Sequence, residues 1–186
     1  MPKKVLGLDP GLTRCGFGLI TSSKGRVVRF EEVGVLESSP DEELSQRIYE
    51  IGQQVEKLLD RTKPDLVAVE RVFSQQNLKT VVSVANISGV IAYLSRARRI
   101  SVDYFTPTQV KAAVTGSGKA NKSQVSSMVK RILNLQELPK PADATDALAI
   151  AITAAWRAGY AQDDAPLTAA QLKWRDAENA SQKRRR

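Results

Sequence analysis

The order of the apolar segments constrains the fold of this chain more than any other feature. Three strand-like runs follow one another at 4–9, 16–22 and 26–36, with only short turns between them. Strands joined by such short connections pair antiparallel. Helical and strand-like segments then alternate, and a strand reached through a helical crossover pairs parallel to its neighbour. The order therefore predicts an α/β fold with a mixed five-stranded sheet flanked by helices.

The later segments follow from apolar spacing and from proline and glycine breaks. A helix is expected to open at Ser39-Pro40-Asp41 and to run to about Asp60, because its apolar residues recur every three or four positions. The remaining expected elements are a strand at 65–70, a helix at 78–95, a strand at 100–105, a short helix from Thr106 and helices at 122–134 and 143–158. We expect one domain over 1–160 and a polar, basic and flexible tail over 161–186.

Two residue counts exclude whole classes of chemistry. The chain has no histidine and a single cysteine, Cys15, which we expect to be a small buried residue. These counts exclude histidine-based catalytic triads, cysteine-cluster zinc sites and intrachain disulfides. A bound metal must therefore have oxygen ligands, as Mg²⁺ or Mn²⁺ prefers. We see neither a secretory signal nor an apolar run of the roughly 18 residues that a membrane span needs, and expect a cytoplasmic protein that contacts no membrane.

The net charge of +8 is unevenly distributed. Residues 1–95 contain twelve basic and twelve acidic residues, whereas residues 96–140 contain nine basic and two acidic ones. A well-solvated surface would explain such a segment, but a contact with a phosphate backbone explains it better, because most of the chain is close to neutral. Lys111, Lys119 and Lys122 lie in this basic segment and are candidates for contact with nucleic acid.

Four carboxylates stand at positions where elements begin or end. Asp9 and Glu70 each end an apolar strand, and Asp143 and Asp146 begin the last helix on one face. Each has an ordinary structural explanation. Asp9 could begin an Asp-Pro-Gly turn, Glu70 could be a solvated strand end, and the helix-start pair could cap the helix and complement its dipole.

Taken together, these acids favour a metal centre. If the strands of Asp9 and Glu70 are neighbours, both carboxylates emerge at one end of the sheet, where the start of the last helix can add Asp143 and Asp146. Unpaired carboxylates gathered in one place repel one another unless cations neutralise them. Such a cluster holds two Mg²⁺ ions roughly 4 Å apart, one activating water and one stabilising the leaving oxygen of a phosphodiester. With a basic segment nearby, the combination predicts a metal-dependent nuclease.

Four collinear motifs resemble the RuvC family of bacterial Holliday junction resolvases. They are VLGLDPGLTRCGFGLI at 5–20, VAVERVF at 67–73, QVKAAVTGSGKANKSQVSSMV at 109–129 and ADATDALAIAIT at 142–153. The resemblance implies an RNase H-like fold, with Asp9, Glu70, Asp143 and Asp146 as catalytic acids that bind Mg²⁺, two ions per subunit, which Mn²⁺ can replace. It also implies that Lys111 and Lys122 contact DNA and that Phe73 stacks on bases opened at the junction. The family works as a homodimer beside the branch-migration motor proteins RuvA and RuvB.

The expected activity is resolution of four-way junctions by paired symmetric nicks, in homologous recombination and DNA repair. Water attacks a junction phosphate in line and leaves 5′-phosphate and 3′-hydroxyl ends. One acid cluster cuts one strand, so two subunits related by a two-fold axis are needed. The apolar helix at 78–95 is the candidate dimer interface, and burial of this helix within its own monomer is the alternative.

Other functions explain fewer of these features. The DPG-x-T start also resembles the first phosphate loop of actin-like and sugar-kinase ATPases, but those need a second phosphate loop and a longer chain. Gly118-Lys119 is not a Walker A motif, because Ala113 and Ala120 stand where glycine and serine or threonine are required. A shorter RNase H-like RNA-processing nuclease would share only the first motif. A binding protein without enzymatic activity would leave the four acids without a role.

Overall fold

The structure is a computed structural model that describes residues 2–23, 26–71 and 78–160. Its sheet has the strand order β3-β2-β1-β4-β5. The antiparallel strands are β1 (Lys3–Asp9), β2 (Arg14–Ser22) and β3 (Val28–Glu37). On the other side of β1, β4 (Leu66–Glu70) and β5 (Ser101–Phe105) run parallel to it. The mixed five-stranded sheet is therefore confirmed.

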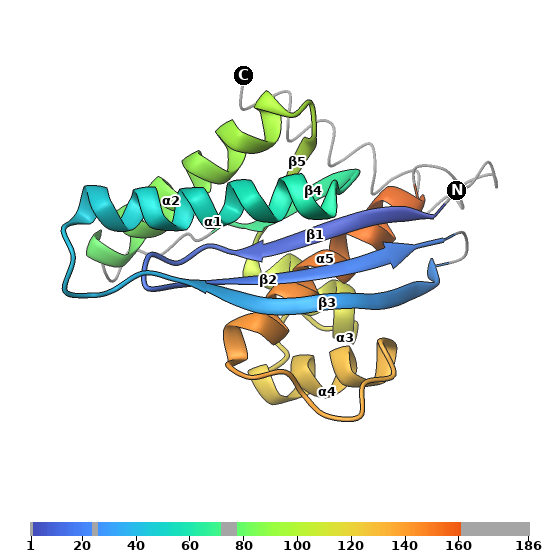
Figure 1. Cartoon of the computed structure of the whole chain (residues 1–186). Coiled ribbons are helices and arrows are strands. Elements are labelled where there is room, and N and C mark those ends of the chain that lie inside the picture. Colours follow the sequence, from blue (N-terminus) through green and yellow to red (C-terminus); the bar gives the residue numbers. More distant parts are fainter. Residues whose placement is uncertain (1, 24–25, 72–77, 161–186) are drawn as a thin grey trace, which may run out of the picture.

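Helices cover both faces of this sheet (Figure 1). One face carries α1 (Leu44–Thr62) and α2 (Leu78–Ala97). The other carries α3 (Pro107–Thr115), α4 (Lys122–Ile132) and α5 (Ala142–Tyr160). The one clear shift from expectation is the start of α1, which lies at Leu44 rather than at Ser39-Pro40-Asp41. The Ser39 hydroxyl accepts a hydrogen bond from the amide of Asp41 (3.3 Å), so these residues form a local turn instead of capping the helix.

Alternation along the central strands divides the core into two layers. Leu6 and Leu8 of β1 face Ile51, Val55 and other residues of the α1–α2 layer. Val5 faces the opposite layer, where α5 supplies Leu148 and Ile152. Cys15 is fully buried in the first layer, as expected. In the part of the chain that the structure describes, no helix is long and apolar enough to cross a bilayer.

Helix α5 approaches the sheet unusually closely, because glycines line the face on which it lies. A Cβ atom at Gly7 would overlap the carbonyl oxygen of Ala147 and lie 2.7 Å from the amide nitrogen of Ala151. A Cβ at Gly16 would overlap the carbonyl of Asp143. The backbone of α5 therefore rests directly on β1 and β2, which fixes the first turn of the helix relative to the strand ends.

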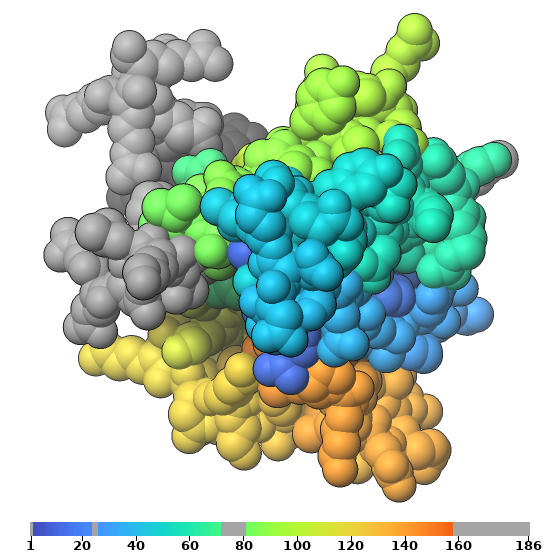
Figure 2. All heavy atoms as spheres, turned by 60° about the vertical axis from the view of Figure 1, so that its left-hand side comes forward, coloured from blue at the N-terminus to red at the C-terminus, as the bar shows by residue number. Residues whose placement is uncertain are grey.

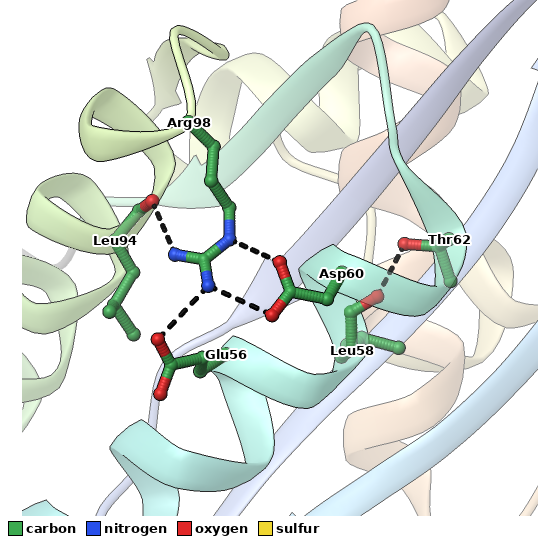
Figure 3. A network of polar contacts seen from close by, with 6 residues as sticks. All are labelled: Glu56, Leu58, Asp60, Thr62, Leu94 and Arg98. Carbon is green, nitrogen blue, oxygen red and sulfur yellow. Dashed lines mark hydrogen bonds and ion pairs between the residues drawn. The ribbon is translucent and has the colours of Figure 1, made fainter.

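On the opposite face, one arginine ties α1 to the end of α2 (Figure 3). Arg98 donates from Nε to Asp60 (2.6 Å) and from Nη2 to both Asp60 and Glu56 (3.0 Å each), while Nη1 donates to the carbonyl of Leu94 (3.2 Å). Pairing with Arg98 holds the pKa of Asp60 below its usual value. These contacts fix the two helices as one layer above β1 and β4.

The close contact of α5 predicts that Gly7→Ala lowers the free energy of unfolding by about 3 kcal/mol, since the added methyl group meets helix backbone that cannot rotate away. Gly34→Ala is the matched control, because a Cβ there meets the ring of Phe17, a side chain that can move. Urea unfolding of both variants measures the difference. An equal loss for the two would contradict the proposed role of the α5 backbone contact.

Candidate functional site

Asp9 and Glu70 lie side by side at the end of the sheet. Leu8 pairs with Val69 in the parallel register of β1 and β4, so the next residues, Asp9 and Glu70, stand at the same level on adjacent strands. Adjacent strands are about 5 Å apart. Because Leu8 and Val69 face the α1–α2 layer, strand alternation directs both carboxylates toward the α5 side. The expected meeting of these two acids is confirmed.

Helix α5 brings the other two carboxylates to the same end. Asp143 lies in the first turn of α5, and its backbone carbonyl packs against Gly16, the residue that pairs with Asp9 across the β1–β2 ladder. Asp146 follows one turn later, and its charge acts on both Asp9 and Glu70. We call Asp9, Glu70, Asp143 and Asp146 the acid cluster.

The electrostatics of the acid cluster are those of crowded, partly buried carboxylates. Burial first, and then repulsion from the charges of Glu70, Asp146 and Asp143, together raise the pKa of Asp9 to about 7. Burial is also the main cause of the raised pKa of Glu70, followed by repulsion from Asp146. The charged forms of both acids are therefore costly without a cation beside them.

The predicted lysines occupy different positions around this cluster. Lys122, the first residue of α4, places Nζ 2.8 Å from Oδ2 of Asp146, and this hydrogen bond raises the pKa of Lys122. Lys111 on α3 is close enough to Glu70 for its charge to oppose part of the rise in the pKa of Glu70. Lys119 is exposed in the connection between α3 and α4. The structure thus joins Lys111 and Lys122 electrostatically to the acids and leaves Lys119 exposed between α3 and α4.

Arg14 is a cation of the site that the sequence pattern did not single out. It begins β2, and its Nε lies 3.2 Å from Oδ2 of Asp143. The antiparallel register offered a signal, because Gly16 pairs with Asp9 and Arg14 stands two residues beyond, at the same end of the sheet. The sequence does not show how closely α5 approaches the sheet. This close approach brings Asp143 within reach of Arg14.

The donor set of the acid cluster suits a hard divalent cation. Its four side chains offer only carboxylate oxygens, the ligands that Mg²⁺ and Mn²⁺ prefer. Within residues 2–23, 26–71 and 78–160, no three acidic or cysteine side chains are already gathered around one point as a finished metal site. Lys122 and Arg14 hold two of the four carboxylates. A metal ion would fit if Asp143 released Arg14 and Asp146 released Lys122, so that both carboxylates could bind the metal instead.

This end of the sheet is open to the surface. It lies at the left of Figure 1, and Figure 2 looks toward it, with blue N-terminal atoms at the surface between the cyan start of α1 and the orange segment near α5. The yellow α3 and α4 lie beside them. Phe73 and the tail at 161–186 lie outside the described residues, so the predictions about them remain predictions.

Sequence comparison identifies relatives over the whole chain. The model of the family described as crossover junction endodeoxyribonuclease RuvC matches residues 5–154. The protein of that name from Paenarthrobacter aurescens is 50% identical over 189 residues, covering 100% of each chain. The Mycobacterium ulcerans protein is 52% identical over 155 residues, covering 83% of this chain and 84% of its own.

Solved structures agree with the sequence comparison. Thermus thermophilus RuvC in complex with a Holliday junction substrate is similar with a TM-score of 0.81 and 34% identity, over 86% of this chain and 96% of that one. The yeast mitochondrial Holliday junction resolvase, at 16% identity and a TM-score of 0.59, shares the fold over 83% of this chain and 80% of its own. The RNase H-like fold is thereby confirmed. The chain belongs to the RuvC family of crossover junction endodeoxyribonucleases.

Proposed function

We propose that this chain resolves Holliday junctions by paired symmetric nicks, as a crossover junction endodeoxyribonuclease. The observation that carries the proposal is the meeting of four carboxylates from three separate elements at one open end of the sheet. Lys111 on α3 and Lys122 on α4 lie beside them and suit a polyanionic substrate. Membership in the RuvC family supports the choice of a four-way junction over linear DNA.

In this proposal Asp9, Glu70, Asp143 and Asp146 hold divalent cations, two Mg²⁺ per subunit, with Mn²⁺ able to replace them. Bound there, the metal supplies Lewis-acid stabilisation of the reacting phosphodiester and a more acidic water. The four carboxylates keep the cations at the end of β1, where the α5 contact fixes their relative positions. Hydrolysis in line leaves 5′-phosphate and 3′-hydroxyl ends.

The cations of this chain have roles that follow from their positions. Lys122 holds Asp146 and faces the acid cluster, so its ammonium group can also stabilise charge that develops on the scissile phosphate. Lys111, beside Glu70, contacts the DNA backbone, and Lys119 extends that contact at the periphery. For Phe73 we retain the role of a side chain that stacks on an unpaired base.

A homodimer is proposed because two strands must be cut. Helix α2 has two apolar faces. Its inward face buries Ile87 and Ile91, whereas Val82 and Tyr93 are 53% and 73% exposed. Exposed Ala85 and Gly89 lie between these two along the same stripe, at helical spacing. We propose that this outward stripe, Val82-Ala85-Gly89-Tyr93, packs against its copy in the second subunit.

The cellular setting follows from the activity. We propose action in the cytoplasm in homologous recombination and DNA repair, beside the branch-migration proteins RuvA and RuvB. Residues 1–160 form the nuclease domain in this proposal, and the basic tail at 161–186 is its appendage.

Asp9→Asn should abolish cutting of a synthetic four-way junction while leaving junction binding within about threefold, since the change removes a proposed metal ligand and little volume. Binding is measured in EDTA and cutting in Mg²⁺, with linear duplex and RNA hairpins as competing substrates. Asp103→Asn, an exposed acid on β5, is the matched control and should cut normally. Loss of folding in the Asp9 variant, or retained cutting, would remove Asp9 from the proposed chemistry.

The raised pKa of Asp9 predicts that the stability of the metal-free protein falls as pH rises. Below pH 3.8 the carboxyl group is protonated in both states. Between pH 3.8 and about 7 the unfolded chain releases this proton and the folded protein retains it, so the free energy of unfolding decreases, on the order of a few kcal/mol in all. Above about pH 7 the decrease is complete.

Urea unfolding in EDTA tests this pH dependence. The stability advantage of Asp9→Asn over the parent should grow between pH 5 and pH 8, because the neutral amide has no proton to lose. A constant difference across that range would contradict the raised pKa of Asp9 in the folded protein.

The dimer proposal predicts that Tyr93→Glu produces a monomer, since a buried unpaired carboxylate is costly at an interface. Sedimentation measures the assembly state, and the ratio of nicked to fully resolved junctions measures paired cutting. Val27→Glu changes another exposed apolar residue, which is 51% exposed and lies at the opposite end of the sheet from the acid cluster, and this variant should remain dimeric. A dimeric Tyr93→Glu protein would place the interface elsewhere.

A further inference from the structure

A hollow with two arginines lies beside the acid cluster. It has a volume of about 370 Å³ and lies between the turn at 11–14 and the helices α1 and α2. Arg14, Arg47 and Asp143 contribute the charged groups of its lining, and Ser83 and Thr13 contribute hydroxyl groups. Two cations facing one carboxylate leave the hollow with a net positive charge. Its natural occupant is therefore an anion.

Arg47 and the turn form one preorganised unit. Arg47 donates from Nη2 to Oγ1 of Thr13 (2.7 Å) and from Nε to Oγ of Ser38 (3.2 Å). The buried Ser38 hydroxyl in turn donates to the carbonyl of Leu12 (2.6 Å). These bonds fix the turn that follows Asp9, and they fix the guanidinium of Arg47 at the wall of the hollow.

Arg14, unlike Arg47, has a side chain that is exposed enough to contact a ligand directly. Its side chain is 52% exposed and meets Asp143 through Nε. A guanidinium carries five N–H donors, more than one carboxylate can accept, and its planar fork matches a phosphate group. Arg14 can therefore bind an anion with the donors that Asp143 does not use, and with all five donors once a metal ion takes the place of Arg14 at Asp143.

The position of Arg14 relates the hollow to the proposed DNA path. Across the sheet end the strands come in the order β2, β1, β4, so Arg14 lies on one side of Asp9 whereas Glu70, with Lys111 near it, lies on the other. A strand of DNA passing over the acid cluster would meet cations on both sides. A second hollow that Arg14 borders contains Glu37 and Glu50 and would repel phosphate, which leaves the Arg47 side as the binding side.

We propose that Arg14, with Arg47 behind it, binds a phosphate of the cut strand next to the scissile one, on the side of the acid cluster away from Lys111. This phosphate site rests on the proposed nuclease function and adds to it a second anchor on the substrate. Two anchors flanking the reacting group would fix the position of the scissile phosphate along the strand.

Arg14→Gln tests the site in an Asp143→Asn background, in EDTA, so that binding is measured without cutting and without the ion pair. A four-way junction should bind about tenfold more weakly, and the slope of log affinity against log salt should become shallower by about 0.9, the change for one phosphate contact. Arg29→Gln, an exposed arginine at the opposite end of the sheet, is the matched control and should change neither quantity.

Junctions that carry one neutral methylphosphonate near the cut locate the contact. At one flanking position, Arg14→Gln should cause no further loss, because the charge that it contacts is already gone. A loss at every position, an unchanged salt slope, or an effect of Arg14→Gln that disappears in the Asp143→Asn background would each overturn the phosphate site. Failure of Asp143→Asn alone to prefer four-way over linear DNA would instead count against the nuclease function on which the site rests.

Discussion

The contact between helix α5 and the glycine-lined face of β1 and β2 determines the geometry on which the site depends. Side chains at Gly7 and Gly16 would hold the helix away, because each would overlap its backbone carbonyls. Without them the helix lies low, and Asp143 comes to the level of the strand end that carries Asp9. A larger spacing between the helix and the sheet would separate the two carboxylates that come from strands from the two that come from α5.

The acid cluster is costly for folding, and the charges around it show how that cost is limited. Burial and repulsion raise the pKa of Asp9 and of Glu70, so these acids resist being charged together. Lys122 and Arg14 each neutralise one of the remaining acids. The same two cations lie beside the proposed path of the DNA, so the groups that neutralise these acids are also placed to act on a substrate.

The sequence predicted the elements that have a strong apolar period, and it predicted the acids that end them. Asp9 and Glu70 were recognisable because each closes a run of buried residues, and parallel pairing then places strand ends together. Arg14 was not recognisable in this way, since its importance depends on the distance between α5 and the sheet. The predicted start of α1 was also wrong. Ser39-Pro40-Asp41 has the residue pattern of a helix cap, but its hydrogen bond closes a local turn before the helix.

Helix α2 links the proposed dimer contact to the chemistry. Val84 borders the hollow beside Asp143 and also a second one beside Glu70, while Val82 and Tyr93 of the same helix face outward. Arg98 links the end of α2 to Glu56 and Asp60 of α1. If two copies meet along the outward stripe, the distance between their acid clusters is set by rigid elements. Such a dimer would select substrates in which two symmetry-related phosphates lie at this fixed distance. A four-way junction offers that distance and a linear duplex does not.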